Sequence, residues 1–328
     1  MAQERRTSMA DVAARAGVSG QTVSRVVNAS PRVDPATRAR VEAAMRDLGY
    51  RPHRAARALR TGRSRTIGVV ASTLATVGNY RMLQAVADAA GQRGYAVTAV
   101  TVTGTDTLAS AFRTLVDQGV DGAIVLNEAT ALARGVDAPT GVRLVVVDAP
   151  LDAGFGVVAS DHAAGARTAT EHLLAGGHET VAHLAGPADS FAAQERERGW
   201  RAALLAAGRT PLDVVRGDWS AASGYRVGIV LADDPRAPAV FVANDQMALG
   251  LLRAIADRDR RVPEDVAVVG FDDVPDAANY RPPLTTVRQD FDTLGEQAVH
   301  ALIDTIGGAE PAAALIHTRL IVRDSSGA

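Results

Sequence analysis

The pattern of apolar and polar residues near the start of the chain predicts three short helices, at about residues 9–16, 20–28 and 34–50. The first follows a serine and precedes a glycine, residue types that commonly cap the two ends of a helix. The second has valines on one face and polar side chains on the other. The third begins with Asp-Pro, a capping residue followed by proline at the first helical position. Two helices joined by a glycine-containing turn and covered by a third are typical of the helix-turn-helix unit.

From Thr66 onward, short apolar runs alternate with helical stretches, which predicts parallel sheets built from βαβ units. The runs form two series, at residues 67–71, 96–102, 122–126 and 144–147, and then at 181–184, 240–242 and 266–271, with helices of the second series near 161–176, 192–207, 220–232 and 244–258. Two α/β lobes in series form a cleft. Ligands of such sheets bind beyond the carboxyl ends of the strands.

The composition of the chain excludes several kinds of chemical site. The chain of 328 residues contains no cysteine, which excludes disulfides, thiol nucleophiles and cysteine-ligated metals. No apolar stretch approaches the roughly 20 residues that span a bilayer, and the first ten residues do not resemble a signal peptide. We therefore expect a cytoplasmic protein with no membrane partner, no cofactor and no metal.

Charge is distributed unevenly. Residues 1–65 contain 14 Arg and 5 acidic residues, whereas residues 66–328 contain 21 Arg and 32 acidic residues. A basic head provides the attraction that a phosphate backbone requires, so we expect the helix-turn-helix unit to bind DNA. The Arg-rich segment 51–65 holds one large apolar side chain, Leu59. It is either a flexible linker or a segment that becomes helical on DNA and inserts Leu59 into the minor groove.

Polar residues follow several predicted strands of the body. Asp148, Asn244 and Asp272 each come directly or almost directly after an apolar run, and Arg196 and Trp219 lie near predicted helix starts. Any one of these residues could be only a helix cap. As a set, carboxylates, an amide, a guanidinium and an indole ring are the groups that bind sugar hydroxyls and stack on a sugar face.

Two other classes of protein share some of these features. A sugar-processing enzyme would need a catalytic pair, for which Asn244-Asp245 with Asp272-Asp273 is a candidate, but a nearby guanidinium would keep these carboxylates ionised and favour binding. The histidines lack metal-site spacing and no Gly-x-Ser-x-Gly turn occurs near them. An extracytoplasmic sugar-binding protein would carry a signal sequence in place of an Arg-rich head.

Long stretches of the chain resemble the lactose-repressor (LacI/GalR) family of bacterial transcription regulators: DVAARAGVSGQTVSRVVN, LGYRPHRAARALRTGRSRTIGVV, GDWSAASGY, VANDQMALG, VGFDDV and RPPLTTVRQDFDTLG. The resemblance implies a helix-turn-helix head (1–51), a hinge helix (52–65) and a two-lobed periplasmic-binding-protein-like core (66–328). Its lobes would comprise about 66–160 with 291–320, and 161–290 with 321–328. The chain would cross between lobes near residues 160, 290 and 320.

The resemblance also implies functional residues. Base contacts fall on Gly20, Gln21 and Arg25, DNA-backbone contacts on Ser19, Thr22, Asn28 and Arg32, and the minor-groove wedge on Leu59. Sugar contacts fall on Ser72, Asp148, Arg196, Trp219, Asn244, Asp272, Gln289 and Phe291. Three features depart from the family pattern: Gly20 replaces a tyrosine, Ala159 replaces an aromatic residue at the pocket, and Thr76, Gly78, Asn79 and Met82 occupy the stretch that faces the group attached to the sugar. We therefore expect the operator sequence to differ from that of family members with the tyrosine. We also expect the pocket to differ from theirs where it faces the group attached to the sugar.

The function implied is that of a non-enzymatic, allosteric repressor of carbohydrate-utilisation genes, released from a palindromic operator by a sugar inducer, with a galactoside as one candidate. The alternative within the family is a regulator that binds DNA only when its ligand is bound. The sequence closes with HTRLIVRDSSGA and shows no leucine-heptad tail, so we expect a homodimer.

Overall fold

The computed structural model describes residues 7–27, 30–50, 62–102, 108–126, 141–151 and 155–327. The chain divides into two compact units, Met1–Ser64 and Arg65–Ala328, and each is described by itself. We refer to them as the head and the core. No helix in the described ranges is long and apolar enough to cross a membrane.

The described part of the head contains α1 (Met9–Ala16), α2 (Gly20–Val27) and α3 (Pro35–Asp47). The three helices enclose a small core in which Val12, Val23 and Val41 are fully buried. α1 begins with the predicted serine cap, and Asp11 completes a capping box with it. α3 ends at Asp47, three residues earlier than predicted, because the chain turns through a left-handed glycine two residues later.

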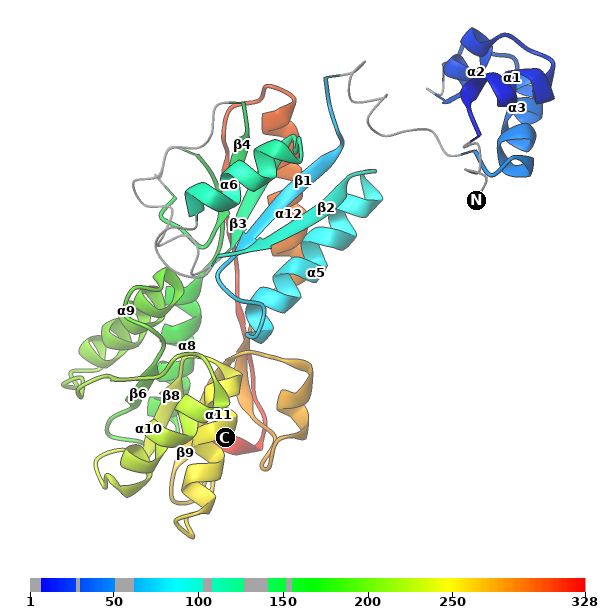
Figure 1. The fold of residues 1–328 in the computed structure, drawn as a ribbon. Helices are drawn as coiled ribbons and strands as arrows, with labels where there is room; N and C mark the ends of the chain where they lie inside the picture. The colour runs from blue at the N-terminus through cyan, green and yellow to red at the C-terminus, as the bar shows by residue number, and fades with distance from the viewer. Residues whose placement is uncertain are drawn as a thin grey trace. The chain divides into compact units, whose positions relative to one another are not determined.

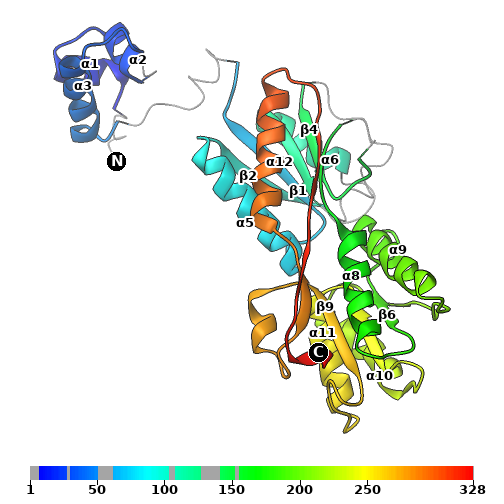
Figure 2. The same cartoon turned by 180° about the vertical axis from the view of Figure 1, so that it is seen from behind.

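The first sheet of the core is entirely parallel where its strand pairs are described. Its strands in spatial order are β11 (Ala313–Ile316), β5 (Gly156–Ser160), β4 (Arg143–Val147), β3 (Gly122–Leu126), β1 (Thr66–Ala71) and β2 (Ala96–Thr101). Helix α6 (Leu108–Asp117) covers one face, and α5 (Val77–Gln92) with α12 (Phe291–Ile306) covers the other (Figures 1 and 2). We call this part the first lobe.

The second sheet is parallel except for one edge, since β12 pairs antiparallel with β10. Its strands in spatial order are β12 (Arg319–Ile321), β10 (Thr285–Arg288), β9 (Ala267–Asp272), β8 (Ala239–Val242), β6 (Ala182–Ala185) and β7 (Val215–Arg216). The helices are α8 (His162–Ala175) and α9 (Phe191–Ala206) on one face, and α10 (Ala221–Asp233) and α11 (Asp245–Ala256) on the other. Two short 3-10 turns, η1 (Pro275–Asn279) and η2 (Asp324–Ser326), complete this second lobe.

The chain passes between the two lobes at three places, after β5, after β10 and between β11 and β12. These positions agree with the expected crossings near residues 160, 290 and 320. The expectation of parallel sheets is wrong only for β12, which runs antiparallel because it follows β11 after a two-residue link and returns along β10. The two predicted lobes are confirmed as a pair of sheets, each covered on both faces by helices.

Candidate functional site

The outer face of α2 is polar and accessible, as a recognition helix requires. Five of the six described residues of the predicted DNA-binding set are exposed, namely Ser19, Gly20, Gln21, Arg25 and Arg32. Thr22 is half-buried because it faces the N-terminal cap, where the Ser19 hydroxyl accepts a hydrogen bond from the Thr22 backbone N–H at 3.1 Å. The remaining two predicted residues, Asn28 and Leu59, lie outside the described residues.

The core contains a pocket between the carboxyl ends of strands from both sheets. Seven of the eight predicted sugar-binding residues line it: Asp148, Arg196, Trp219, Asn244, Asp272, Gln289 and Phe291. They come from both lobes and from the crossing after β10. Residues more than 140 positions apart in the sequence thus meet at one site.

Ser72 does not line this pocket. It is half-buried just after β1, and the wall on that side is formed by Thr76 and Gly78, at the start of α5. Three residues separate Ser72 from Thr76, the N-cap of α5. The pocket wall is therefore formed by residues further along the sequence than the end of β1. The backbone in this segment is fixed by buried Asn79, whose side-chain amide donates to the Thr73 carbonyl at 2.9 Å.

Two other expectations for the pocket wall need correction. Ala159 is buried in the apolar layer under α6 and does not face the pocket. Its neighbour Ser160 has the opposite orientation, as adjacent strand residues do, and donates from its hydroxyl to the Gln289 side-chain oxygen at 2.7 Å. Met82 is also a core residue, packed between α5 and the first sheet. Thr76 and Gly78 are the residues of that stretch that reach the pocket.

Arg196 is the central cation of the pocket. Its guanidinium lies over the Phe271 ring, with Cζ 3.9 Å from the ring centre and 5.5 Å from the centre of the Trp219 ring. One terminal nitrogen donates to the Ala243 carbonyl, and the other lies 3.5 Å from Asp272 Oδ1. With only 4% of its surface exposed, this side chain is locked in one orientation.

Asp148 provides the carboxylate of the first lobe. Its Oδ1 accepts the Ser160 backbone N–H at 3.1 Å and lies 2.9 Å from His162 Nε2. Burial disfavours the ionised form, but His162, the Ser160 amide and Arg196 outweigh burial and hold the pKa of Asp148 below its usual value. The pocket therefore has an ionised acceptor on its first-lobe side at neutral pH.

Asp272 provides the carboxylate of the second lobe, and its electrostatic balance is different. Burial raises its pKa to about 6, against the opposing effects of Arg196 and of the Gln289 amide, which donates to Oδ1 at 2.6 Å. The buried Asp245, just behind it, contributes a second acidic group, whose own pKa burial and Asp272 raise well above the usual value. Asp245 accepts from the Thr286 hydroxyl at 2.6 Å and from the Val274 backbone N–H at 2.8 Å, which anchors the turn after β9.

Trp219 forms the aromatic wall. Its ring packs on the backbone of Gly186, where a Cβ atom would lie 2.3 Å from the indole, so only glycine fits there. The buried Trp219 Nε1 forms no hydrogen bond with any described residue. Asn244 caps α11 with its side-chain oxygen and donates its amide to the Trp219 carbonyl at 3.1 Å. The wall thus presents a rigid aromatic ring and a buried N–H donor in need of a partner.

Three pocket residues adopt a backbone conformation that side chains other than glycine rarely adopt. Asp148, Trp219 and Asp272 have φ values of 60°, 72° and 113°. Each such residue costs on the order of 1 kcal/mol and persists where the surrounding structure fixes it. Their concentration around one pocket indicates that the backbone is shaped there for binding and not for stability.

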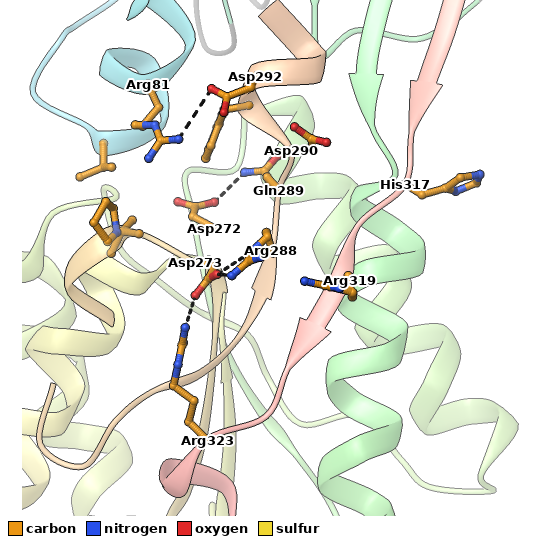
Figure 3. Close-up of a pocket in the computed structure, with 14 residues that line it drawn as sticks. Arg81, Asp272, Asp273, Arg288, Gln289, Asp290, Asp292, His317, Arg319 and Arg323 are labelled. Carbon is orange, nitrogen blue, oxygen red and sulfur yellow. Dashed lines mark hydrogen bonds and ion pairs between the residues drawn. The ribbon is translucent and has the colours of Figure 1, made fainter. Parts of the chain in front are cut away.

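A second, wider cavity adjoins the pocket and shares Asp272, Gln289 and Phe291 with it (Figure 3). Asp273 lies between two arginines and pairs with Arg288 and Arg323, each at 2.6 Å. His317 lies in the link between β11 and β12 and points away from this cluster, whereas Arg319, the first residue of β12, extends toward it (Figure 3). The cavity wall is therefore built from the crossings, tied together by ion pairs.

Comparison with known proteins gives matches for both units. Residues 8–53 match the profile of bacterial regulatory proteins of the lacI family, and residues 170–326 match the periplasmic binding protein-like domain. The chain is 40% identical to the lactose operon repressor of Escherichia coli K12, over 91% of this chain and 84% of that protein. It is 38% identical to the HTH-type transcriptional regulator CelR of Thermobifida fusca, over 99% and 100%.

Solved structures agree with these matches. The chain is similar to the lac repressor dimer bound to operator and the anti-inducer ONPF, with a TM-score of 0.88 and 37% identity over 99% of this chain and 100% of that one. It is also similar to the complex of the regulator CelR with cellobiose, with a TM-score of 0.74 and 36% identity over 98% and 100%.

Proposed function

The chain belongs to the lacI family of bacterial regulatory proteins, and we propose that its pocket binds a sugar that releases the protein from its operator. Like its relatives, it is a DNA-binding transcriptional regulator and not an enzyme. It binds operator DNA through the helix-turn-helix head and acts as a dimer, because two heads related by a two-fold axis match a palindromic site. The genes that it regulates are those of carbohydrate utilisation.

One observation carries the sugar proposal. Asp148, Arg196, Asn244 and Asp272 line one pocket together with the Trp219 ring. Paired acceptors and donors suit adjacent hydroxyls, each of which both donates and accepts, and an aromatic ring suits the C–H face of a pyranose. These residues, together with Gln289 and Phe291, are our proposed effector site.

The small residues of the pocket bear on the size of the effector. Thr76, Gly78 and Ala192 line it, and their short side chains can border a group attached to the first sugar ring. Relatives are named for lactose and crystallised with cellobiose, both β-linked disaccharides. We propose a β-glycoside of about this size, with a galactoside and a glucoside as the first two candidates.

In the head, we propose that Gln21 and Arg25 contact bases, that Ser19, Thr22, Asn28 and Arg32 contact the DNA backbone, and that Gly20 leaves its position without a base contact. We further propose that residues 52–65 form the hinge, with Leu59 as the minor-groove wedge. The exposed polar face of α2 supports the first assignment.

The test is operator binding with and without sugar. An operator is first selected from a random duplex pool with the purified protein, and its affinity is then measured by fluorescence anisotropy in the presence of lactose, cellobiose and matched monosaccharides. We expect at least one β-glycoside to weaken operator binding. A sugar that strengthens binding would instead identify the regulator type that needs its ligand to bind DNA, and binding unchanged by every glycoside would overturn the sugar proposal.

A further inference from the structure

Two buried polar residues adjoin the pocket without lining it, and both lie at the first crossing between the lobes. Ser160 is the last residue of β5 and His162 is the first residue of α8. They are 3% and 1% exposed. Neither is available to a ligand in the pocket, yet both contact residues that are.

His162 joins the two lobes through its two ring nitrogens. Nε2 lies 2.9 Å from Asp148 Oδ1, in the first lobe, and Nδ1 accepts a hydrogen bond from Arg196 Nε at 3.3 Å, in the second. An arginine N–H can only donate, so Nδ1 must be the unprotonated nitrogen and the proton is on Nε2. Nε2 lies at ion-pair distance from Asp148 but forms no hydrogen bond of good geometry with it. The ring thereby fixes the position of a carboxylate and a guanidinium that belong to different lobes.

Ser160 completes a closed circuit of polar contacts. Its hydroxyl donates to Gln289, the Gln289 amide donates to Asp272 at 2.6 Å, and Asp272 lies 3.5 Å from Arg196. The Ser160 backbone N–H donates to Asp148 Oδ1 at 3.1 Å, which closes the circuit. The circuit therefore passes through both lobes and through two of the three crossings.

A change in the angle between the lobes would have to separate some of these groups. A buried polar group that loses its partner is costly, so the circuit resists partial rearrangement and favours a change of all its contacts together. A sugar that touches Asp148 in one lobe and Arg196 or Asp272 in the other touches the circuit at two points.

We propose that His162 is a positioning residue that couples the effector contacts of the first lobe to those of the second. It contacts no effector atom itself and acts through Asp148 and Arg196. The proposal rests on the proposed function in one respect, namely that a sugar occupies the pocket. The geometry of His162 is independent of that assumption and is tested separately.

The first test is a double-mutant cycle on sugar affinity, measured by calorimetry with cellobiose and lactose as probes. His162→Phe keeps the ring and removes both nitrogens, and it should weaken sugar binding by about tenfold or more. Because His162 acts through Asp148, His162→Phe should reduce sugar affinity much less in the Asp148→Asn background than in the wild-type chain. Additive losses would show that His162 only fills space, and would overturn the proposal.

Two further variants keep this test decisive. His162→Gln retains an amide able to donate toward Asp148 and should recover most of the affinity that His162→Phe loses. His183→Gln changes another buried histidine, which lies in the second-lobe core against Phe241 and outside the circuit, and should leave sugar affinity unchanged. If His162→Phe fails to fold, His162→Leu takes its place. A loss in His162→Gln as large as in the apolar variant would overturn the proposal, and so would a loss of that size in His183→Gln.

The second test needs no sugar. Nitrogen-15 NMR of the histidines in the full chain, with His162 assigned from the His162→Gln spectrum, should show Nε2 protonated and Nδ1 as an unprotonated acceptor. A proton on Nδ1 would overturn the proposal. If no glycoside binds the wild-type chain, the proposed function fails while this measurement still decides whether His162 holds Asp148 and Arg196 together.

Discussion

At the scale of single residues, the two pocket carboxylates differ in how they respond to pH. Asp148 is kept ionised by His162, the Ser160 amide and Arg196, whereas burial raises the pKa of Asp272 to about 6. Asp272 should therefore be roughly nine-tenths ionised at pH 7 and roughly nine-tenths protonated at pH 5. The same pocket then offers two charged acceptors at neutral pH and one in mild acid.

This difference predicts that sugar affinity falls as the pH is lowered from 7 to 5. Hydroxyl donors form stronger hydrogen bonds with an ionised carboxylate than with a neutral one, and protonation removes that advantage at Asp272. Affinity measured by calorimetry at half-unit steps should decline around pH 6. Asp272→Asn, which cannot ionise, should be weaker at pH 7 and independent of pH across this range; a wild-type affinity that stays constant would contradict the prediction.

A second residue links pH to stability. Burial lowers the pKa of His183 to about 4, and its Nδ1 donates to the Phe241 carbonyl at 3.0 Å. The folded state therefore holds this histidine neutral, while in the unfolded chain its pKa is 6.5, the ordinary value. Stability from this residue is present above pH 6.5 and is lost as the pH falls toward 4, by an upper limit of about 3 kcal/mol.

Urea denaturation between pH 7 and 4 measures that loss. His183→Gln retains a donor for Phe241 and does not titrate, so its free energy of unfolding should fall less steeply with acidification than that of the wild-type protein. His317→Gln, at an exposed position of the β11–β12 crossing, is the matched control and should follow the wild-type slope. Identical slopes in all three proteins would exclude His183 as the cause.

At the scale of elements, the accuracy of prediction depended on whether the signal was local. The helices of the head were predicted because their caps and apolar spacing lie within a few residues, and α1 begins where its serine cap indicates. Strands β5, β7, β10, β11 and β12 and helix α12 were not identified from the apolar pattern. β11 and β12 have three or four residues each, and their partners lie far away in the sequence, so pairing in the folded state is what makes them strands.

The recognition helix carries a prediction about sequence preference. Arg25 is exposed on the polar face of α2, opposite buried Val23 and Val26. Arg25→Ala should cost about 1–3 kcal/mol of operator affinity and relax the preference at one base position of each half-site. Selection from a random duplex pool measures both effects. Arg15→Ala removes the same charge from α1, where Arg15 pairs with Asp47, and should leave the selected sequence unchanged; an unaltered preference in Arg25→Ala would remove Arg25 from the base-reading set.

The packing of α10 on α11 carries a prediction about stability. A Cβ atom at Gly250 would lie 2.1 Å from the Ala221 carbonyl oxygen, so the two helices approach through backbone and cannot accommodate a methyl group. Gly250→Ala should destabilise the core by at least about 1–3 kcal/mol, as overpacking does. Gly91→Ala, at an open position of α5, should be neutral or stabilising by up to about 1 kcal/mol because alanine favours helix. Thermal unfolding compares the two, and equal effects would contradict the close approach.

At the scale of the whole core, the sequence identified the pocket better than it identified what holds the pocket together. Strand-end positions predicted Asp148, Asn244 and Asp272, because carboxyl ends of parallel strands meet at one edge. Ser72 satisfied the same rule but lies off the pocket wall. His162 was not found, because a histidine after an Asp at a helix start has no local feature that distinguishes it. Its role depends on Arg196, which reaches it only in the folded chain.

The arrangement of these residues across two lobes predicts how the regulator responds to its effector. A ligand shifts an equilibrium only by binding one state more tightly than the other. A sugar held by Asp148 in the first lobe and by Arg196 and Asp272 in the second meets this condition, because its contacts depend on the angle between the lobes. Losing one of these groups should therefore remove the response to sugar more than it removes operator binding.

Arg196 provides the sharpest form of this prediction. Its guanidinium binds Ala243, approaches Asp272 and lies on the Phe271 ring, and a lysine cannot reproduce that planar fork. Arg196→Lys keeps the charge beside the buried carboxylates, so the chain should still fold and bind operator, but release should require sugar at about tenfold or higher concentration. Arg201→Ala, on the exposed side of the same helix, should release DNA as the wild-type protein does. Release of Arg196→Lys at the wild-type sugar concentration would show that the effector binds elsewhere.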